Sequence, residues 1–137
     1  MQLSKAIPAL PIRDAGRAVE FYRDKFGFAV VHHDGGFAVM TRDDVVLNLW
    51  EASDESWRER AVNVRPVQSG AESFIAGTAS CRITVDGVDD LYAELSSNDI
   101  LHKVSREGVS DTDFGAREFH TVDRDGNLVT FFEWVAR

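Results

Sequence analysis

The order of segments in the first half of this chain is repeated in the second half, and this duplication constrains the fold more than any other feature. An apolar strand-like run, a helical stretch and three further strand-like runs occur in each half. In the first half these segments are 6–12, 14–27, 28–33, 37–41 and 45–51; in the second they are 81–85, 88–95, 100–105, 116–122 and 128–134. The pattern predicts an α+β protein made of two tandem βαβββ units.

The halves can be overlaid residue by residue. Adding 73 to a residue number places Ile12 on Val85, Ala18 on Leu91, Val19 on Tyr92 and Tyr22 on Leu95; adding 82 places Arg42 on Arg124, Asp43 on Asp125, Leu49 on Phe131 and Glu51 on Glu133. The shift changes because the second half carries a longer segment at 107–114. We therefore predict a single domain over 1–137, with a first unit at 5–51, a connection at 52–78 and a second unit at 79–134.

Short-range signals agree with these segments. Asp14 can accept the free amide protons of a first helical turn, and Gly27 suits the left-handed residue that ends a helix. Pro8 cannot donate a hydrogen bond to a neighbouring strand, so the first strand is expected at a sheet edge or crossing to another subunit.

The connection at 52–78 is long and polar, and connections of this kind are usually functional or disordered. Trp57, Phe74 and Ile75 are apolar residues that could dock it as a flap over a cleft. A mobile linker with a short helix near 54–60 explains the same composition, and the sequence leaves both interpretations open.

Composition excludes several functional classes. Fifteen Lys and Arg against 23 Asp and Glu give a net charge of −8, which disfavours nucleic acid and anionic membranes and favours cationic ligands. Negative charge also simply keeps proteins soluble. No apolar run approaches the roughly 20 residues of a membrane span, and the N-terminal residues do not resemble a secretory signal. With a single cysteine, we expect a cytoplasmic protein without disulfides.

Two motifs carry a family resemblance. The first is Phe21-Tyr22 followed by Phe26-Gly27-Phe28, and the second is the turn Asp123-Arg124-Asp125-Gly126-Asn127. In this order and spacing, the chain resembles the glyoxalase/bleomycin resistance/dioxygenase superfamily, also called the vicinal oxygen chelate superfamily. The resemblance implies two concave sheets around a ligand cleft, and it covers nearly the whole chain outside 52–78.

Enzymes of that superfamily hold a divalent metal on four strand positions, which prefer imidazole or carboxylate ligands. The matching positions here are Ile7, Asn48, Ser80 and Thr130. They provide one alkyl group, one amide and two hydroxyls, so the resemblance implies a binding protein without catalytic residues and without a metal or other cofactor of its own.

Within the superfamily, the chain is similar to the bleomycin resistance proteins. The similarity lies in the stretches 34–39, 42–45, 85–94 and 114–119. Members of that branch sequester a cationic glycopeptide antibiotic unmodified, as homodimers that exchange the first strand and form two clefts between subunits. Any metal would arrive with the antibiotic.

This resemblance assigns ligand-binding roles. Phe37 and Phe114 match the aromatic pair that sandwiches flat heteroaromatic rings. Carboxylates for a cationic tail, hydrogen-bonding groups for a polar head and aromatic walls complete the site. The carboxylate candidates are Asp34, Asp111, Asp113, Glu118 and Glu133; the polar residues are Asn48, Ser80 and Thr130; the walls are Trp50 and Trp57.

Two rival functions remain open from the sequence. A metal-dependent lyase, isomerase, dioxygenase or thiol transferase would share the fold, and so would a binder of another planar ligand. The histidines His32, His33, His102 and His120 do not occupy the metal positions, and we interpret them as surface or hydrogen-bonded side chains.

Overall fold

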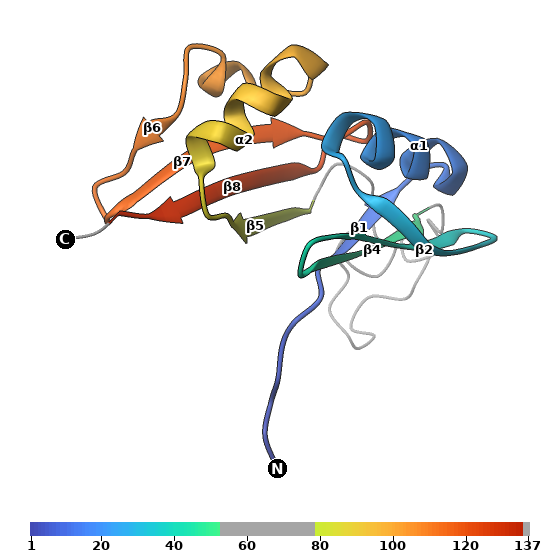
Figure 1. Cartoon of the computed structure of the whole chain (residues 1–137). Helices are drawn as coiled ribbons and strands as arrows, with labels where there is room; N and C mark the ends of the chain where they lie inside the picture. Colours follow the sequence, from blue (N-terminus) through green and yellow to red (C-terminus); the bar gives the residue numbers. More distant parts are fainter. Residues whose placement is uncertain (53–78, 136–137) are drawn as a thin grey trace, which may run out of the picture.

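The computed structural model describes residues 1–52 and 79–135 (Figure 1). The first unit contains β1 (Ala9–Ile12), α1 (Ala15–Phe26), β2 (Ala29–Asp34), β3 (Phe37–Arg42) and β4 (Val45–Glu51). The second contains β5 (Ser80–Thr84), α2 (Val88–Leu95), the 3₁₀ helices η3 (Ser96–Asn98) and η4 (Lys103–Ser105), β6 (Ser110–Asp111), β7 (Ala116–Val122) and β8 (Leu128–Trp134). In the described residues, no helix is long and apolar enough to cross a membrane.

The sheet topology confirms the duplication. Each unit forms a four-stranded sheet, in the order β1-β4-β3-β2 and β5-β8-β7-β6, and in each the first strand pairs in parallel with the last. Leu10 pairs with Leu49 in the first sheet and Ile83 with Phe131 in the second, and the overlay of the two halves makes these pairs equivalent. The two sheets therefore have the same register as well as the same order.

The predicted strand at 100–105 is wrong. Only Leu101 makes a bridge, to Thr121, and Lys103–Ser105 is a 3₁₀ helix. The fourth strand of the second sheet is instead the two-residue β6. Backbone hydrogen bonds still join Ile100 and His102 to β7, whereas the Tyr92 hydroxyl on α2 donates a 2.8 Å hydrogen bond to the Ser105 carbonyl, so the chain leaves the sheet only after His102.

The overlay of the last hairpin holds for its strands and fails at its turn. Arg42 pairs with Val45 around two residues, whereas Val122 pairs with Leu128 around five. Asp43 is exposed at φ 51°, while Asp125 is buried. The proposed equivalences of Arg42 with Arg124 and of Asp43 with Asp125 are therefore wrong, because a longer turn has replaced a tight one.

Helix α1 begins and ends at the predicted residues. The Asp14 side chain accepts a hydrogen bond from the Arg17 amide, and Gly27 has a left-handed φ of 76°. The helix buries Ala15, Ala18, Val19, Tyr22 and Phe26. The spacing of these residues on one face packs α1 onto the first sheet.

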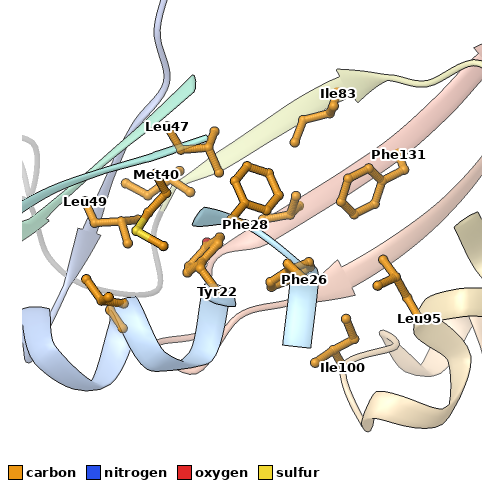
Figure 2. Packing of buried hydrophobic residues seen from close by; sticks show 14 of the residues in the cluster. Tyr22, Phe26, Phe28, Met40, Leu47, Leu49, Ile83, Leu95, Ile100 and Phe131 are labelled. Carbon is orange, nitrogen blue, oxygen red and sulfur yellow. The ribbon is translucent and has the colours of Figure 1, made fainter. Parts of the chain in front are cut away.

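One core joins the two units (Figure 2). Phe26 of α1 lies 6.1 Å from Phe131 of β8, measured between ring centroids. Ile83, Leu95 and Ile100 of the second unit are buried in the same cluster as the residues of the first sheet. The duplicated units therefore depend on each other for burial of their apolar faces.

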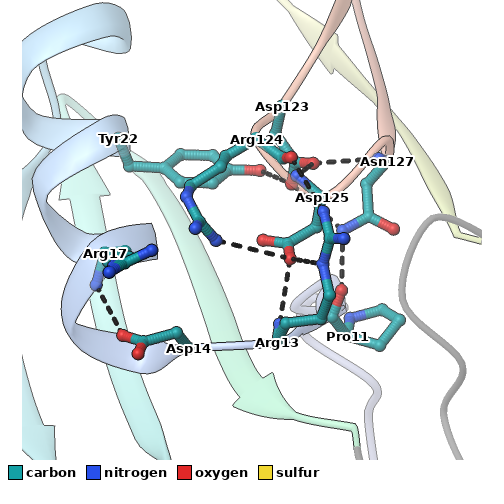
Figure 3. Close-up of polar contacts among 9 residues, drawn as sticks. All are labelled: Pro11, Arg13, Asp14, Arg17, Tyr22, Asp123, Arg124, Asp125 and Asn127. Carbon is teal, nitrogen blue, oxygen red and sulfur yellow. Dashed lines mark hydrogen bonds and ion pairs between the residues drawn. The ribbon is translucent and has the colours of Figure 1, made fainter.

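The turn between β7 and β8 connects the units through buried polar groups (Figure 3). One Asp123 carboxylate oxygen accepts the Tyr22 hydroxyl at 2.8 Å and the Asn127 side-chain amide at 3.0 Å. The other oxygen accepts the backbone amides of Asp125 and Asn127 at 2.8 and 2.9 Å. Since Tyr22 lies on α1, the carboxylate links the second unit's turn to the first unit's helix.

The same turn also contacts the end of β1 (Figure 3). The Asp125 carboxylate accepts the Arg13 backbone amide at 3.0 Å and the Arg13 Nε at 2.9 Å. The Asn127 side chain, fully buried, donates to the Pro11 carbonyl at 2.8 Å. These partners offset most of the cost of burying the polar groups, although Asp125 Oδ2 is buried without a hydrogen-bond partner among the described residues.

Strand β1 is an edge strand, as the presence of Pro8 in this segment predicted. Pro8 directly precedes β1, and its carbonyl accepts the Asn48 amide at 2.9 Å. Residues 1–7 are exposed and extend away from the two sheets (Figure 1). Exchange of this segment between subunits stays a prediction.

Candidate functional site

Each sheet has one face that packs against a helix and an opposite face that we call its open face. Cross-strand partners share a face, so the register assigns the residues. The open face of the first sheet carries Ala9, His32, Asp34, Phe37, Val39, Thr41, Val46, Asn48 and Trp50. The open face of the second carries Ser80, Arg82, Thr84, Ala116, Glu118, His120, Thr130, Phe132 and Trp134.

Four predicted site residues lie together on the first open face. Asp34 pairs with Phe37 across β2 and β3, and Phe37 pairs with Trp50 across β3 and β4. Asn48 lies two residues before Trp50 on the same face. The Phe37 ring is 37% exposed and lies 6.3 Å from the His32 ring, so it offers an aromatic surface beside an exposed carboxylate.

Ser80, Glu118 and Thr130, also predicted, lie on the second open face. His120 connects two of them: its Nδ1 is 2.7 Å from the Thr130 hydroxyl, and its Nε2 is 3.1 Å from the Glu118 carboxylate. Thr130 and Glu118 are buried at 2% and 7% exposure. His120 is therefore a hydrogen-bonded histidine, as the sequence indicated, with both ring nitrogens engaged.

An aromatic and cationic cluster lies at one end of the second open face. The Arg82 guanidinium carbon is 4.4 Å from the centroid of Phe132 and 5.8 Å from that of Phe114. Trp134 lies edge-on to both rings, at 5.2 Å from Phe132 and 6.4 Å from Phe114. Phe114 and Trp134 are 47% and 60% exposed, which leaves their rings available to a planar ligand.

The structure places Phe37 and Phe114 on different sheets. Phe37 begins β3, whereas Phe114 and the neighbouring Asp113 lie in the turn between β6 and β7. Trp57, and with it the predicted flap, lies outside the described residues. The sandwich of the two phenylalanines stays a prediction.

Three of the five carboxylates proposed for a cationic tail have other partners, and Glu118 is paired with Arg82 and His120. Glu133 accepts the Gly87 and Val88 amides at 2.8 and 3.3 Å, so it caps α2 on the helix side of the sheet. These hydrogen bonds lower the pKa of Glu133. Asp111 forms a 2.8 Å ion pair with Arg117. Asp34 and Asp113 are exposed and remain candidates.

Three of the four positions that correspond to metal ligands lie on strands, as predicted, whereas Ile7 lies outside the strand on which it was expected. Ile7 precedes β1, Asn48 lies on β4, Ser80 begins β5 and Thr130 lies on β8. Arg82, rather than Ser80, pairs with Thr130 across the two strands. Among the described residues, no group of three or more His, Cys, Asp or Glu side chains could hold a metal ion.

The free Cys81 thiol lies on β5 and is not suited to nucleophilic chemistry. Burial, together with the charge of Asp123, raises its pKa to about 11. The thiol therefore stays protonated near neutral pH.

Sequence reasoning missed Arg82, Phe132 and Trp134 as residues of the second open face. The signal was present, because a strand places every second residue on one face. Phe132 and Trp134 lie two and four residues after Thr130 on β8, and Arg82 lies two residues after Ser80 on β5. Each of them therefore shares a face with a residue that was predicted.

Comparison with known proteins establishes the family. The Glyoxalase/Bleomycin resistance protein/Dioxygenase superfamily profile matches residues 6–131. The chain belongs to this superfamily. A bleomycin resistance protein of Geobacillus stearothermophilus is 49% identical over 131 residues, which cover 96% of this chain and 97% of that one. A bleomycin resistance protein of Staphylococcus aureus has the same identity and coverage.

Solved structures show the same fold within the superfamily. A bleomycin-binding protein from bleomycin-producing Streptomyces verticillus, complexed with copper(II)-bleomycin, aligns with a TM-score of 0.71, 24% identity and coverage of 100% and 99% of the two chains. A lactoylglutathione lyase from Agrobacterium tumefaciens aligns with a TM-score of 0.68, 23% identity and coverage of 96% and 95%. Since a binding protein and an enzyme share this fold, the fold alone does not decide the function.

Proposed function

We propose that this protein binds a bleomycin-type cationic antibiotic in the cytoplasm and confers resistance by sequestering it unmodified. The observation that carries the proposal is the 49% identity to bleomycin resistance proteins over nearly both whole chains. The exposed aromatic rings on the two open faces agree with such a ligand. By mass action, a bound antibiotic is withdrawn from its target without any chemical step.

The proposed site forms between two protomers. Phe37 and Phe114 lie on different sheets of one chain, so a cleft between the first sheet of one protomer and the second sheet of its partner would bring one of each together. Strands β1 and β5 each have one unpaired edge among the described strands. Met1 and Leu3 are exposed in an extended N-terminal segment, which is suited to exchange with a partner.

The chemistry of the two faces suits the parts of such a ligand. Phe37 and Phe114 would hold the flat heteroaromatic rings, with Trp50 as a further wall. Asp34 and Asp113, together with the net charge of −8, would favour the cationic tail. Asn48 would orient the polar head by hydrogen bonding.

The protein is proposed to act without a cofactor, and the metal of a metal-loaded antibiotic would travel with the ligand. Ile7, Asn48, Ser80 and Thr130 offer weaker ligands than the imidazoles and carboxylates that transition metals prefer. Elemental analysis of the purified protein is expected to find no stoichiometric Ni, Zn, Mn or Fe. A metal bound at one equivalent per chain would favour the metal-dependent enzyme instead.

Calorimetric titration with copper(II)-bleomycin tests the binding directly. We expect one ligand per protomer, and a loss of affinity of roughly 30-fold or more for Phe114→Ala, since buried aromatic contacts often contribute about 2 kcal/mol. Phe21→Leu, in α1 and on neither open face, is the matched control and should bind as the wild type does. Absence of binding at tens of micromolar ligand would overturn the proposal.

A mixed dimer tests where the site is built. Phe37→Ala and Phe114→Ala protomers, carrying different tags, are co-expressed and the heterodimer is purified. If each cleft takes Phe37 from one protomer and Phe114 from the other, the heterodimer has one intact cleft and one that lacks both rings. One wild-type site per heterodimer supports the inter-subunit cleft, and two equally weakened sites contradict it.

A further inference from the structure

Arg82 occupies a position on the second open face that the proposed function does not explain. Its side chain extends from β5 across β8, and it is 43% exposed. A cationic side chain in a cleft that receives a cationic ligand is electrostatically unfavourable for binding. Arg82 therefore requires a role other than charge attraction.

The guanidinium is fixed from two sides. Its Nη1 lies 3.3 Å from the Glu118 carboxylate, and the Glu118 side chain is only 9% exposed. Its planar group lies 4.4 Å from the Phe132 centroid, within the range of a cation–π contact. Glu118 is itself held by His120 and, through it, Thr130. The chain of contacts from Thr130 to Arg82 fixes a long side chain that otherwise has many rotamers.

Phe114 is the second aromatic residue near this guanidinium. The residue belongs to the turn between β6 and β7 and is 47% exposed, so the backbone of a strand does not define its ring position. The Arg82 guanidinium carbon is 5.8 Å from its centroid, and Trp134 approaches it edge-on. The ring therefore packs against a guanidinium that is fixed independently of any ligand.

We propose that Arg82 is a positioning residue that holds the Phe114 ring in place as a wall of the binding site before the ligand arrives. The expected effect of Arg82 on ligand affinity rests on the proposed function. Its physical basis is preorganisation: a ring already in its bound position loses little conformational freedom on binding. Arginine suits this role better than lysine because its planar group stacks on aromatic faces.

Arg82→Gln separates positioning from simple electrostatics. Removing a positive charge should tighten the binding of a cationic ligand if charge alone matters. If Arg82 positions Phe114, copper(II)-bleomycin should bind about tenfold more weakly, which corresponds to about 1.4 kcal/mol. Arg23→Gln removes an exposed arginine from α1 and is the matched control. Unchanged or tighter binding by Arg82→Gln would overturn the proposal.

A double-mutant cycle identifies the ring through which Arg82 acts. In a Phe114→Ala background, Arg82→Gln is expected to change the affinity by less than about twofold, because the positioned group is gone. A full tenfold loss in that background would mean that Arg82 contacts the ligand directly, and would contradict a positioning role.

The ligand-free protein supplies a readout that does not depend on the proposed function. In ¹H–¹³C spectra of phenylalanine-labelled protein, with the Phe114 signal assigned through Phe114→Leu, Arg82→Gln should shift and narrow that signal as the ring becomes mobile. The signal of Phe28, which is buried in the core, should stay in place. An unshifted Phe114 signal would refute the proposal even if the protein bound no bleomycin, while a shifted signal without binding would refute only the proposed function.

Discussion

The turns that close the last hairpin of each unit differ sharply, although the strands on either side are equivalent. In the first unit, Asp43 and Asp44 form a tight exposed turn. In the second, the turn has five residues, of which the polar residues Asp123, Asp125 and Asn127 are buried and contact α1 or the end of β1. The duplicated units have diverged at the place where one must bind the other, and the longer turn is the one that makes the connection.

The capping of the two helices shows a similar difference. Asp14, adjacent to α1 in sequence, caps α1 through its own side chain. Gly87, at the start of α2, has no side chain that could cap the helix. The Glu133 carboxylate on β8 accepts the Gly87 amide instead. The first unit thus uses a local interaction where the second uses a tertiary one.

The largest effect is expected for the buried turn. Asp123→Ala removes a carboxylate that accepts four hydrogen bonds. The Tyr22 hydroxyl, the Asn127 side-chain amide and the backbone amides of Asp125 and Asn127 lose this acceptor. We expect a loss of about 3 kcal/mol or more in the free energy of unfolding, measured with urea. Asp44→Ala, in the exposed turn of the first unit, is the control and should change it by less than about 0.5 kcal/mol. Equal losses of unfolding free energy for the two substitutions would show that both turns contribute equally to stability.

Tyr22→Phe is expected to have a smaller effect, about 1 to 2 kcal/mol, because Asp123 keeps its other donors. The substitution also changes the response to alkali. Burial, followed by the charge of Asp123, raises the pKa of Tyr22 well above its ordinary value. The stabilisation is present below about pH 10, the pKa of an unfolded tyrosine, and is lost as pH rises toward the folded pKa. Urea midpoints from pH 8 to 11 should therefore fall more steeply for wild type than for Tyr22→Phe.

Glu133→Gln should lower the thermal midpoint by a few degrees, since the neutral amide is a weaker acceptor for the α2 amides. Because these hydrogen bonds lower the Glu133 pKa, its stabilisation is present above the unfolded pKa and is lost as pH falls through the folded value. Thermal melts between pH 3 and 7 should show a shallower acid dependence for Glu133→Gln. Glu51→Gln, at the equivalent position of the first unit, is the control.

The smallest effect is expected for the surface ion pair between the units. Arg42 donates to both Glu94 oxygens, at 2.8 and 2.9 Å, and the Glu94 side chain is 51% exposed. Glu94→Gln should cost at most about 0.5 kcal/mol at low salt, with a smaller difference at 1 M NaCl. A cost near that of Asp123→Ala would show that the units are joined as strongly at this surface contact as at the buried turn.

Most of the fold was predictable because it follows from local periodicity. The boundaries of β4, β7 and β8 agree with the predicted runs, since alternating apolar residues define them. The segment 100–105 was misassigned because its apolar residues face different environments: Ile100 is in the core, while Val104 is 60% exposed. Residues 100–102 stay hydrogen-bonded to β7, and the contact of Ser105 with Tyr92 of α2, which takes the chain away from the sheet after His102, is a tertiary one.

The candidate site was predictable in part. The aromatic and polar candidates on the strands do share faces, because a strand alternates its side chains. The roles of Glu133 and Arg82 were not predictable, since each depends on a partner far away in sequence. Glu133 reaches an amide at Gly87, and Arg82 reaches Glu118 and two aromatic rings.

The sequence by itself determined the duplication, the strand and helix periods, the capping of α1 and the absence of strong metal ligands at the four matching positions. Tertiary structure decided which charges are neutralised, which acidic residue caps a distant helix and which turn joins the units. The physical reason is range: backbone periodicity and capping act over a few residues, whereas ion pairing and burial depend on where the folded chain brings distant groups together.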